Sequence, residues 1–536
     1  MDQVRGWIGQ TACALQAALR LSNEAFAEHL GIGVRTVAAW HQKPTLRPRP
    51  EMQQLLDTAL EQASAPTRAR FAVLTGDAVQ AGSPPLPEQQ LTDDRAVSEA
   101  ERRLSTDPAI AAALDRLDQH ADWDPGTARR HVASRLAQVD VRHLRDRANL
   151  RGRTSQRHLA EALGGYYREQ GSDHSRYRAR FGEDSEIVTS VLTRPDWLDL
   201  GCPLSAVCDQ LTLTNVAADH GMWLDEEAAD AAAQRLAETL ATGTRLTDMP
   251  LYRLLDIDVG QGQIAGSLGV TQFVRYALTM DLLEGELTDA LTAGLSLRPG
   301  SLPLRDRYLP DLASVLNVGG RLCAGGAQAL CAFARPADPY RGPADYILLI
   351  QERSGNVVNA AYRLAVIPKG FHQPMTDYRA DARIGATLRR EMEEELFGRE
   401  DIDNTLAEPH AADPMHPARL SEPMRWLLAN PDAWTTECTG FGLNLVSGNF
   451  EFACLIVVDS EDFWLHYGGQ IEANWESMTL RQYSSLDGES LAGLAHDPAW
   501  SNEGVFALLQ GLRRLREVGG DRVDVPAIEW GYSGER

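Results

Sequence analysis

The N-terminal part of the chain repeats apolar residues three or four positions apart, which is the spacing of one helix face. This spacing runs through Leu15, Leu19, Phe26, Leu30, Val37, Trp40, Leu55, Leu56 and Leu60. Strand-like alternation is missing from this stretch. The pattern predicts an all-α head over residues 1–75.

The residue pattern changes twice after the head. Residues 76–94 begin with Gly76 and gather two glycines and three prolines before residue 91, which predicts a linker. Residues 95–300 are rich in Ala, Leu, Arg and Glu and have few β-branched runs. We therefore expect an α-helical middle region there.

The last part of the chain, residues 301–536, has a different pattern. Runs of β-branched and aromatic residues predict strands at 346–350, 362–367 and 450–458, with a charged helix between the second and third strands. This is typical of an α+β domain. A length of 536 residues fits about three domains, so the fold class we expect is multidomain.

The composition limits the possible functions. The sequence has 43% hydrophobic and 24% charged residues and no stretch of about 18 uncharged apolar residues, so we expect no membrane partner. The first residues do not resemble a secretory signal, and the seven cysteines form no paired motif. We expect a cytoplasmic protein with reduced thiols.

The distribution of charge along the chain matters more for nucleic-acid binding than the net charge. The whole chain carries −23, yet residues 1–75 hold eight Lys or Arg against six Asp or Glu. A slightly basic head on an acidic body is compatible with DNA binding through the head alone.

A local motif in the head points to the same function. Ser22 can cap a first helix, Gly31 can supply a left-handed turn, and residues 34–42 can form a second helix with Val37 and Trp40 on its inner face. The small Ala27 suits a close helix crossing. The order of these residues predicts a helix-turn-helix unit.

This unit resembles the XRE, or Cro/C1-type, family of helix-turn-helix regulators, whose second helix enters the major groove of double-stranded DNA. The resemblance implies that base edges face Gly33, Arg35, Thr36 and Ala39, and that phosphates lie near Lys43, Arg47 and Arg49. The fork of Arg35 suits a guanine edge. The alternative is a four-helix packing unit that has lost DNA binding.

Two other segments can each be interpreted in two ways. Residues 263–276 repeat the spacing of the motif at Ala265 and Gly269, and are either a helical hairpin or a second DNA-binding unit. The six arginines of residues 142–157 form either a solvated helix face or a second phosphate contact.

Carboxylates cluster in the charged helix of the last domain. Glu391, Glu394 and Glu395 share one face if this segment is helical. The repulsion among such like charges would be relieved by a hard cation, so these three residues are candidate ligands for Mg²⁺ or Mn²⁺. A surface helix rich in glutamate is the alternative.

The segment Arg390-Glu-Met-Glu-Glu-Glu395, preceded by a strand and Pro-Lys-Gly, resembles the core of the Nudix hydrolase box. The resemblance implies that Glu391, Glu394 and Glu395 hold divalent ions for pyrophosphate hydrolysis, with Arg390 orienting them. Gly370 stands further upstream than the box glycine of that family, and Phe397 falls where the box has its last glycine. Asp381 is the nearest substitute for the first glutamate of the box.

Other residues complete the set of candidates. Glu451, Glu472 and Glu476 could each add a ligand, and His372 lies near the expected phosphate loop. The glycine pairs at 319–320 and 325–326 have no dinucleotide-binding context and suggest turns.

Together these features predict a sequence-specific transcriptional regulator with a Nudix-like domain that senses a nucleotide-type metabolite. Its partners would be double-stranded DNA, a nucleotide-type small molecule and a second copy in a homodimer. The alternative is a metal-dependent Nudix pyrophosphohydrolase that its DNA-binding head localises. A pure interaction scaffold is the third possibility.

Overall fold

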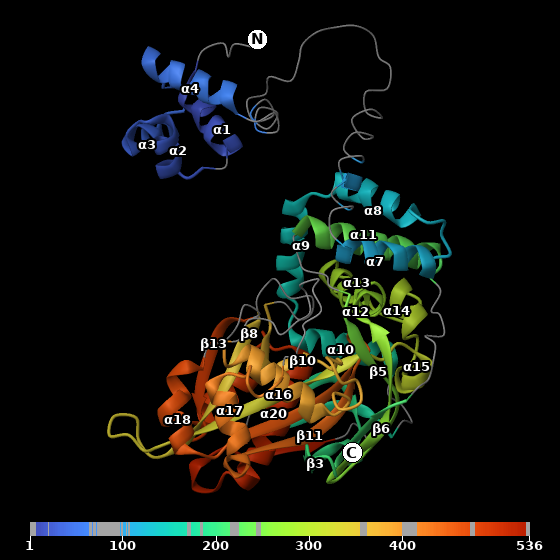
Figure 1. The fold of residues 1–536 in the computed structure, drawn as a ribbon. Helices are drawn as coiled ribbons and strands as arrows, with labels where there is room; N and C mark the ends of the chain where they lie inside the picture. The colour runs from blue at the N-terminus through green and yellow to red at the C-terminus, as the bar shows by residue number, and fades with distance from the viewer. Residues whose placement is uncertain are drawn as a thin grey trace. The chain divides into compact units, whose positions relative to one another are not determined.

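The computed structural model forms two compact units, Met1–Glu88 and Gln89–Arg536, which are described separately (Figure 1). The residues described are 7–19, 21–44, 46–63, 67, 71, 97, 100–102, 104, 108–168, 173–182, 186–214, 224–242, 248–353, 362–398, 415–471 and 477–531. The predicted linker, residues 76–94, lies outside them.

The first unit contains the helices α1 (Gly9–Leu19), α2 (Asn23–Leu30), α3 (Val34–Gln42) and α4 (Pro50–Gln62). The Oγ of Ser22 accepts a hydrogen bond from the N–H of Ala25 at 3.2 Å, so Ser22 caps α2 as predicted. Gly31 has φ +67° in the turn before α3, a conformation that favours glycine. These four helices are compatible with the predicted all-α head.

The core of the first unit is apolar and aromatic. Phe26, Val37 and Trp40 are almost fully buried, as the sequence pattern predicted, and Ala27 is 2% exposed between α2 and α3. The indole N–H of Trp7 donates to Asp57 at 2.7 Å and ties α4 to the start of the chain.

The second unit is built on a large mixed sheet. Its strands, and those of a smaller sheet, are β1 (Ser175–Phe181), β2 (Ile187–Thr193), β3 (Leu198–Pro203), β4 (Asp209–Leu213), β5 (Pro250–Gly260), β6 (Gln263–Gln272), β7 (Gly325–Arg335), β8 (Asp345–Arg353), β9 (Leu364–Val366), β10 (Lys369–Phe371), β11 (Trp434–Asn444), β12 (Phe450–Val458), β13 (Ser477–Ser484) and β14 (Ile528–Gly531).

The large sheet has the order β13-β8-β7-β12-β11-β2-β1-β14, with β10 paired to β7, β3 to β11 and β9 to β8. The pairing of β7 with β12 is parallel, and the other pairings in this sheet are antiparallel. The small sheet has the order β4-β6-β5. The strands predicted at 346–350, 362–367 and 450–458 are confirmed as β8, β9 and β12.

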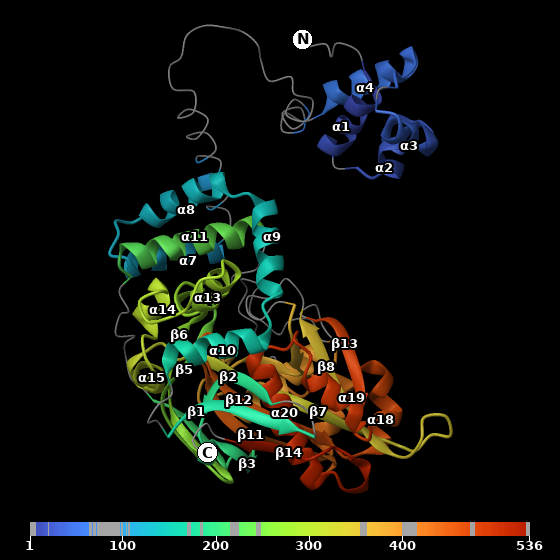
Figure 2. The same cartoon turned by 180° about the vertical axis from the view of Figure 1, so that it is seen from behind.

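Helices surround these sheets (Figures 1 and 2). They are α7 (Pro108–His120), α8 (Thr127–Gln138), α9 (Val141–Gly152), α10 (Gln156–Tyr167), α11 (Glu226–Thr242), α12 (Phe273–Ala277), α13 (Leu282–Thr292), α14 (Pro303–Tyr308), α15 (Leu312–Leu316), α16 (Ile384–Glu395), α17 (Glu422–Ala429), α18 (Glu461–Tyr467), α19 (Gly488–Ala495) and α20 (Asn502–Val518). Five short 3₁₀ turns, at 195–197, 318–320, 431–433, 468–470 and 520–522, complete the described elements.

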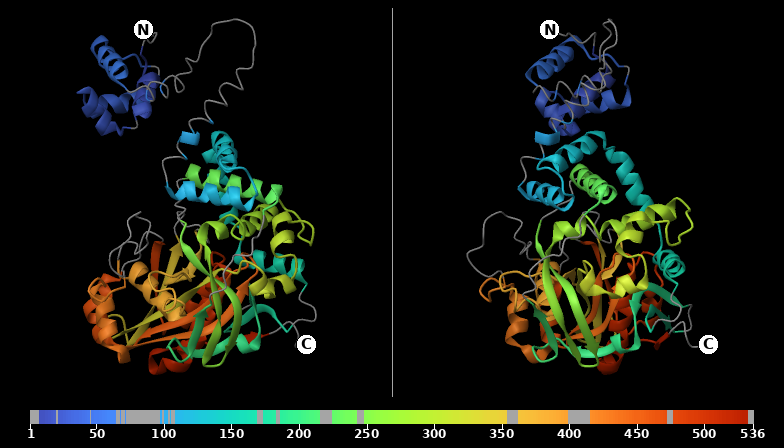
Figure 3. Two further views of the ribbon diagram at one scale, coloured as in Figure 1. Left: turned by 45° about the vertical axis from the view of Figure 1, so that its right-hand side comes forward. Right: turned by 90° about the vertical axis from the view of Figure 1, so that its right-hand side faces the viewer.

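The two faces of the large sheet bury different sets of side chains. Leu388 and Met392 of α16 share a core with Phe450 and Phe452 of β12. Phe506 of α20 shares the opposite core with the alternating β12 residues Ala453, Leu455 and Val457. The sheet therefore lies between α16 and α20. Figure 3 shows the ribbon from two further sides.

The expectation of an all-helical middle region is wrong for residues 175–213 and 250–272, which lie before and after the helix α11. These two stretches contain β1 to β6, and β1 to β3 belong to the same sheet as β7 to β14. The expected domain boundary at residue 300 therefore runs through one compact unit, Gln89–Arg536. The physical reason is visible in β1, where Tyr177, Ala179 and Phe181 alternate with arginines as a half-buried strand requires.

The structure bears on two of the alternatives raised from the sequence. Residues 263–272 form strand β6, so Ala265 and Gly269 belong neither to a helical hairpin nor to a helix-turn-helix. The arginines of α9 lie on a helix with no buried residue, and Arg147 and Arg151 pair with Glu238 and Asp289. This is a solvated, ion-paired face.

Within the described ranges, every helix is too short or too polar to cross a lipid bilayer.

Candidate functional sites

The first candidate site is the outer face of α3. Gly33, Val34 and Arg35 are exposed at its start, and Lys43 is exposed just after its end. Residues 35, 39 and 43 fall on one side of a helix because they are four positions apart. Val37 and Trp40 are buried on the other side, so packing against α1 and α2 holds the face of Arg35 outward.

Hydrogen bonds fix α3 and the segment after it. The Nε2 of His41 lies 2.8 Å from the Oε1 of the buried Gln16, whose own Nε2 donates to Asn23 Oδ1 at 2.9 Å. The N–H of Gly9 donates to the carbonyl of Leu46 at 2.7 Å. A Cβ at Gly9 would lie 2.5 Å from the carbonyl oxygen of Lys43, so only glycine allows this approach. These contacts join α3 and the residues just after it to α1 and α2.

The second candidate site is the row of carboxylates on α16. Glu391, Glu394 and Glu395 are all buried, at 5%, 8% and 1% exposure, so the alternative of a solvated surface helix is wrong. The guanidinium of Arg390 lies 2.7 Å from Glu391 Oε1 and 3.7 Å from Glu394 Oε2. It also donates to the carbonyl of Phe371 at 3.1 Å, which joins α16 to β10.

Strand β10 completes this row. The N–H of Lys369 donates to Glu395 Oε2 at 2.7 Å. A Cβ on Gly370 would lie only 1.9 Å from Glu391 Oε1, and a Cβ on Gly326 would lie 2.1 Å from the carbonyl oxygen of Gly370. The pair Gly325–Gly326 is therefore not a turn: it begins β7 and lets β10 and β12 approach it closely.

Glu393, which was not among the predicted ligands, has a structural role. Its carboxylate accepts from the N–H and Oγ of Ser421 at 2.6 and 2.7 Å, and Ser421 caps α17. His372 is also structural: it is fully buried between Thr387 and the carbonyl of Ala382, and this burial lowers its pKa to about 3.

The predicted metal ligands do not converge on one point. Arg390 and the N–H of Lys369 already occupy oxygens of Glu391 and Glu395. Among the residues that the structure describes, no three His, Cys, Asp or Glu side chains are grouped so as to hold a metal ion. Glu472 and Glu476 lie outside the described residues.

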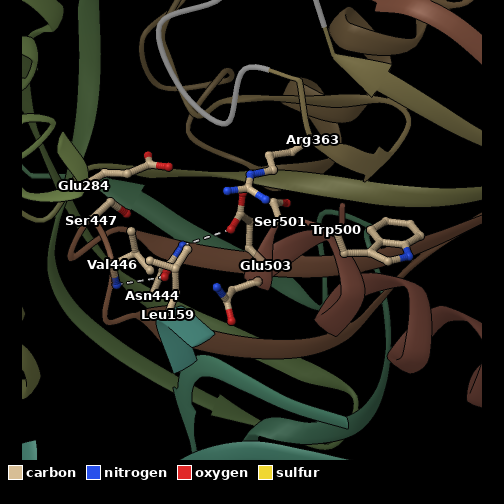
Figure 4. A pocket seen from close by; sticks show the side chains of 10 residues that line it. Leu159, Glu284, Arg363, Asn444, Val446, Ser447, Trp500, Ser501 and Glu503 are labelled. Atoms are coloured by element: carbon tan, nitrogen blue, oxygen red, sulfur yellow. Dashed lines mark hydrogen bonds between the residues drawn. The ribbon is translucent and has the colours of Figure 1, made fainter. Parts of the chain in front are cut away.

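A polar pocket lies behind this row and contains residues that the sequence did not reveal (Figure 4). The Nζ of Lys369 forms a 2.6 Å ion pair with Glu503 at the start of α20. The Nδ2 of Asn444 donates to the other oxygen of Glu503 at 3.0 Å. The lining comprises Leu159, Glu284, Arg363, Asn444, Val446, Ser447, Trp500, Ser501, Asn502 and Glu503.

The acids near this pocket differ in ionisation. Burial opposes the ionisation of Glu503, but the charge of Lys369 outweighs it, so the pKa of Glu503 is lowered. Burial, with the nearby Glu503 carboxylate, holds the pKa of Glu451 well above its usual range. Burial and the charge of Asp281 raise the pKa of Glu284 to about 7. One ionised acid is thus surrounded by acids that favour the neutral form.

Only some residues of this pocket and its surroundings could be predicted from the sequence. Glu451 was a candidate from its place on a predicted strand, and Lys369 belongs to the Pro-Lys-Gly segment. Glu284 and Asn444 carry no local motif, since α13 and β11 meet only through the tertiary fold (Figure 4). The cap Ser501, whose Oγ accepts from the N–H of Gly504, was the one sequence signal for the start of α20.

No protein-family model matches this chain, and no curated protein is significantly similar to it.

Proposed function

We propose that this protein is a sequence-specific DNA-binding transcriptional regulator whose second unit senses a nucleotide-type metabolite. The observation that carries the proposal is the face of α3: Arg35 and Lys43 are exposed while Val37 and Trp40 anchor the helix. An exposed arginine on a rigid helix is the usual means of reading a guanine edge. The resemblance to XRE regulators supports the same interpretation.

Selection of bound fragments from a random DNA pool, followed by mobility-shift titration, tests this function. We expect Arg35→Ala to weaken binding to the selected site by about 1 to 3 kcal/mol, or about 5- to 150-fold, without unfolding the head. Gln54→Ala on the exposed face of α4 is the matched control and should bind as the wild type does. Equal binding by Arg35→Ala and wild type would refute the placement of α3 in the groove.

The sensing part of the proposal rests on the buried row of Arg390, Glu391 and Glu395 and on the cavities beside it. A ligand can regulate DNA binding only if it prefers one of two states, and a useful switch needs about 1 to 3 kcal/mol of coupling. If the protein binds as a homodimer, half-sites should recur about 10 base pairs apart.

Pyrophosphate hydrolysis is the second candidate function, because Arg390, Glu391 and Glu395 stand in the order of the Nudix box against Lys369 and Gly370. Mg²⁺-dependent turnover of nucleotide sugars or ADP-ribose that Glu395→Gln abolishes would favour the enzyme. Stabilisation by these compounds without turnover would favour the sensor.

A further inference from the structure

A second cavity, of about 210 Å³, opens beside α16. Three segments bound it: the loop between β10 and α16, the first turns of α16, and α17 with the residues just before it. Its polar lining residues, here called the polar wall, include Gln373, Asp381, Thr387, Arg389 and Arg390. Its apolar lining residues, here called the methionine wall, include Met375, Met415, Leu420 and Met424.

The size of the cavity limits its occupant. An apolar protein cavity of about 150 Å³ holds one benzene ring. A volume of 210 Å³ therefore accommodates a ring system somewhat larger than benzene, but not a whole nucleotide.

Hydrogen bonds hold two of the polar lining residues, Asp381 and Thr387. Asp381 Oδ2 accepts from the N–H of Met375 at 2.8 Å, which fixes its carboxylate at the wall. The Oγ1 of Thr387 lies 2.7 Å from Nδ1 of the buried His372. Fixed polar groups of this kind bind a complementary ligand without first having to be ordered.

The two walls together select a class of ligand. An aliphatic occupant would desolvate Asp381 without giving it a hydrogen-bond donor, which is costly. A sugar would leave the methionine wall without an apolar partner. A planar heterocycle satisfies both walls, because its faces can contact thioether sulfurs and its amino group can donate to a carboxylate.

We propose that this cavity binds an amino-bearing aromatic heterocycle, with its ring against Met375, Met415 and Met424 and its amino group on Asp381. The inference rests on the proposed sensing function and names the part of the metabolite that is recognised. Arg390 lines the cavity and is ion-paired with Glu391 at 2.7 Å, so the heterocycle and the carboxylate row share one residue.

Calorimetric titration of the full chain with guanosine, adenosine and inosine tests the proposal, because inosine is a purine nucleoside without an exocyclic amino group. We expect guanosine or adenosine to bind at least about tenfold more tightly than inosine, as expected of a site built to pair with that group. Asp381→Asn should remove this preference, and Ala386→Phe, which fills the cavity, should abolish binding. Asp377→Asn, in the same loop but exposed and outside the cavity, should bind as the wild type does.

The proposal is overturned if no nucleoside binds, if inosine binds as tightly as the amino-bearing purines, or if Asp381→Asn or Ala386→Phe binds like the wild type. Thermal denaturation of each variant confirms that it is folded. Nucleosides carry no phosphate, so this titration does not require a phosphate group to bind at the carboxylate row. Mobility shifts on the same samples report DNA binding separately. If the protein binds nucleosides but not DNA, the proposed regulator function is refuted and the proposed heterocycle site is not.

Discussion

The contact between Gly370 and Glu391 gives the sharpest test of how the carboxylate row is built. In Gly370→Ala, the new Cβ would lie 1.9 Å from Oε1 and 2.0 Å from Cδ of Glu391, where real Cβ contacts stay beyond 3.0 Å. The carboxylate must therefore retreat by about 1 Å. It has little room to do so, because Glu391 is 5% exposed and paired with Arg390 at 2.7 Å.

The expected cost follows from how the overlap is relieved. Overpacking in a dense interior costs about 1 to 3 kcal/mol when neighbours can shift. Breaking a buried ion pair costs about 3 to 5 kcal/mol, because a charge is left without its partner. We expect Gly370→Ala to lower the free energy of unfolding of the second unit by about 3 kcal/mol.

Equilibrium denaturation in urea, followed by tryptophan fluorescence, measures this change. Gly469→Ala is the control, because a Cβ there meets no atom within 4 Å and should change stability by less than about 1 kcal/mol. A double-mutant cycle with Glu391→Ala isolates the contact, since Gly370→Ala should cost almost nothing once the carboxylate is absent. The same cost in both backgrounds, within about 0.5 kcal/mol, would refute the reasoning.

Two further predictions concern the pocket in Figure 4. The pKa of Glu284 is raised to about 7, so the folded protein binds more protons than the unfolded chain between about pH 4.5 and 7 and loses stability as the pH rises through that range. Glu284→Gln should therefore be more stable than the wild type at pH 8, by at most about 3 kcal/mol, and this difference should vanish near pH 4.5. Urea denaturation at both pH values measures it. The same difference between variant and wild type at the two pH values would contradict this prediction. Lys369→Met should cost about 3 to 5 kcal/mol at pH 7, because Glu503 loses its buried cation. The pKa of Glu503 is lowered in the wild type, so its stabilisation is present at neutral pH and lost in acid, and the deficit of Lys369→Met should shrink as the pH falls; a constant deficit would show that the ion pair is not its cause.

Local sequence patterns predicted well where neighbouring residues decide the structure. The cap at Ser22, the turn at Gly31 and the buried Val37 and Trp40 all follow from spacing within one helical hairpin. The strands around residue 450 and the helix that carries Glu391 are equally local signals. When one face of a helix or strand is buried, apolar residues recur in the sequence with the period of that element.

The middle of the chain was predicted poorly for the opposite reason. Strands β1 and β2 lie beside β11 and β14, which follow them by more than 200 residues, and no local period records such a pairing. Alanine- and arginine-rich composition then favoured helix over the alternation of Tyr177, Ala179 and Phe181.

By itself, the sequence determined a helical head with a capped hairpin, a mixture of strands and helices near the C-terminus and a row of glutamates on one helix. Only the tertiary structure decided that this row is buried against Lys369 and Gly370, and that Glu284, Asn444 and Glu503 meet in one pocket. The reason is physical: period and capping act over a few residues. The electrostatics of a buried acid depend on whichever charge the fold brings within a few ångströms.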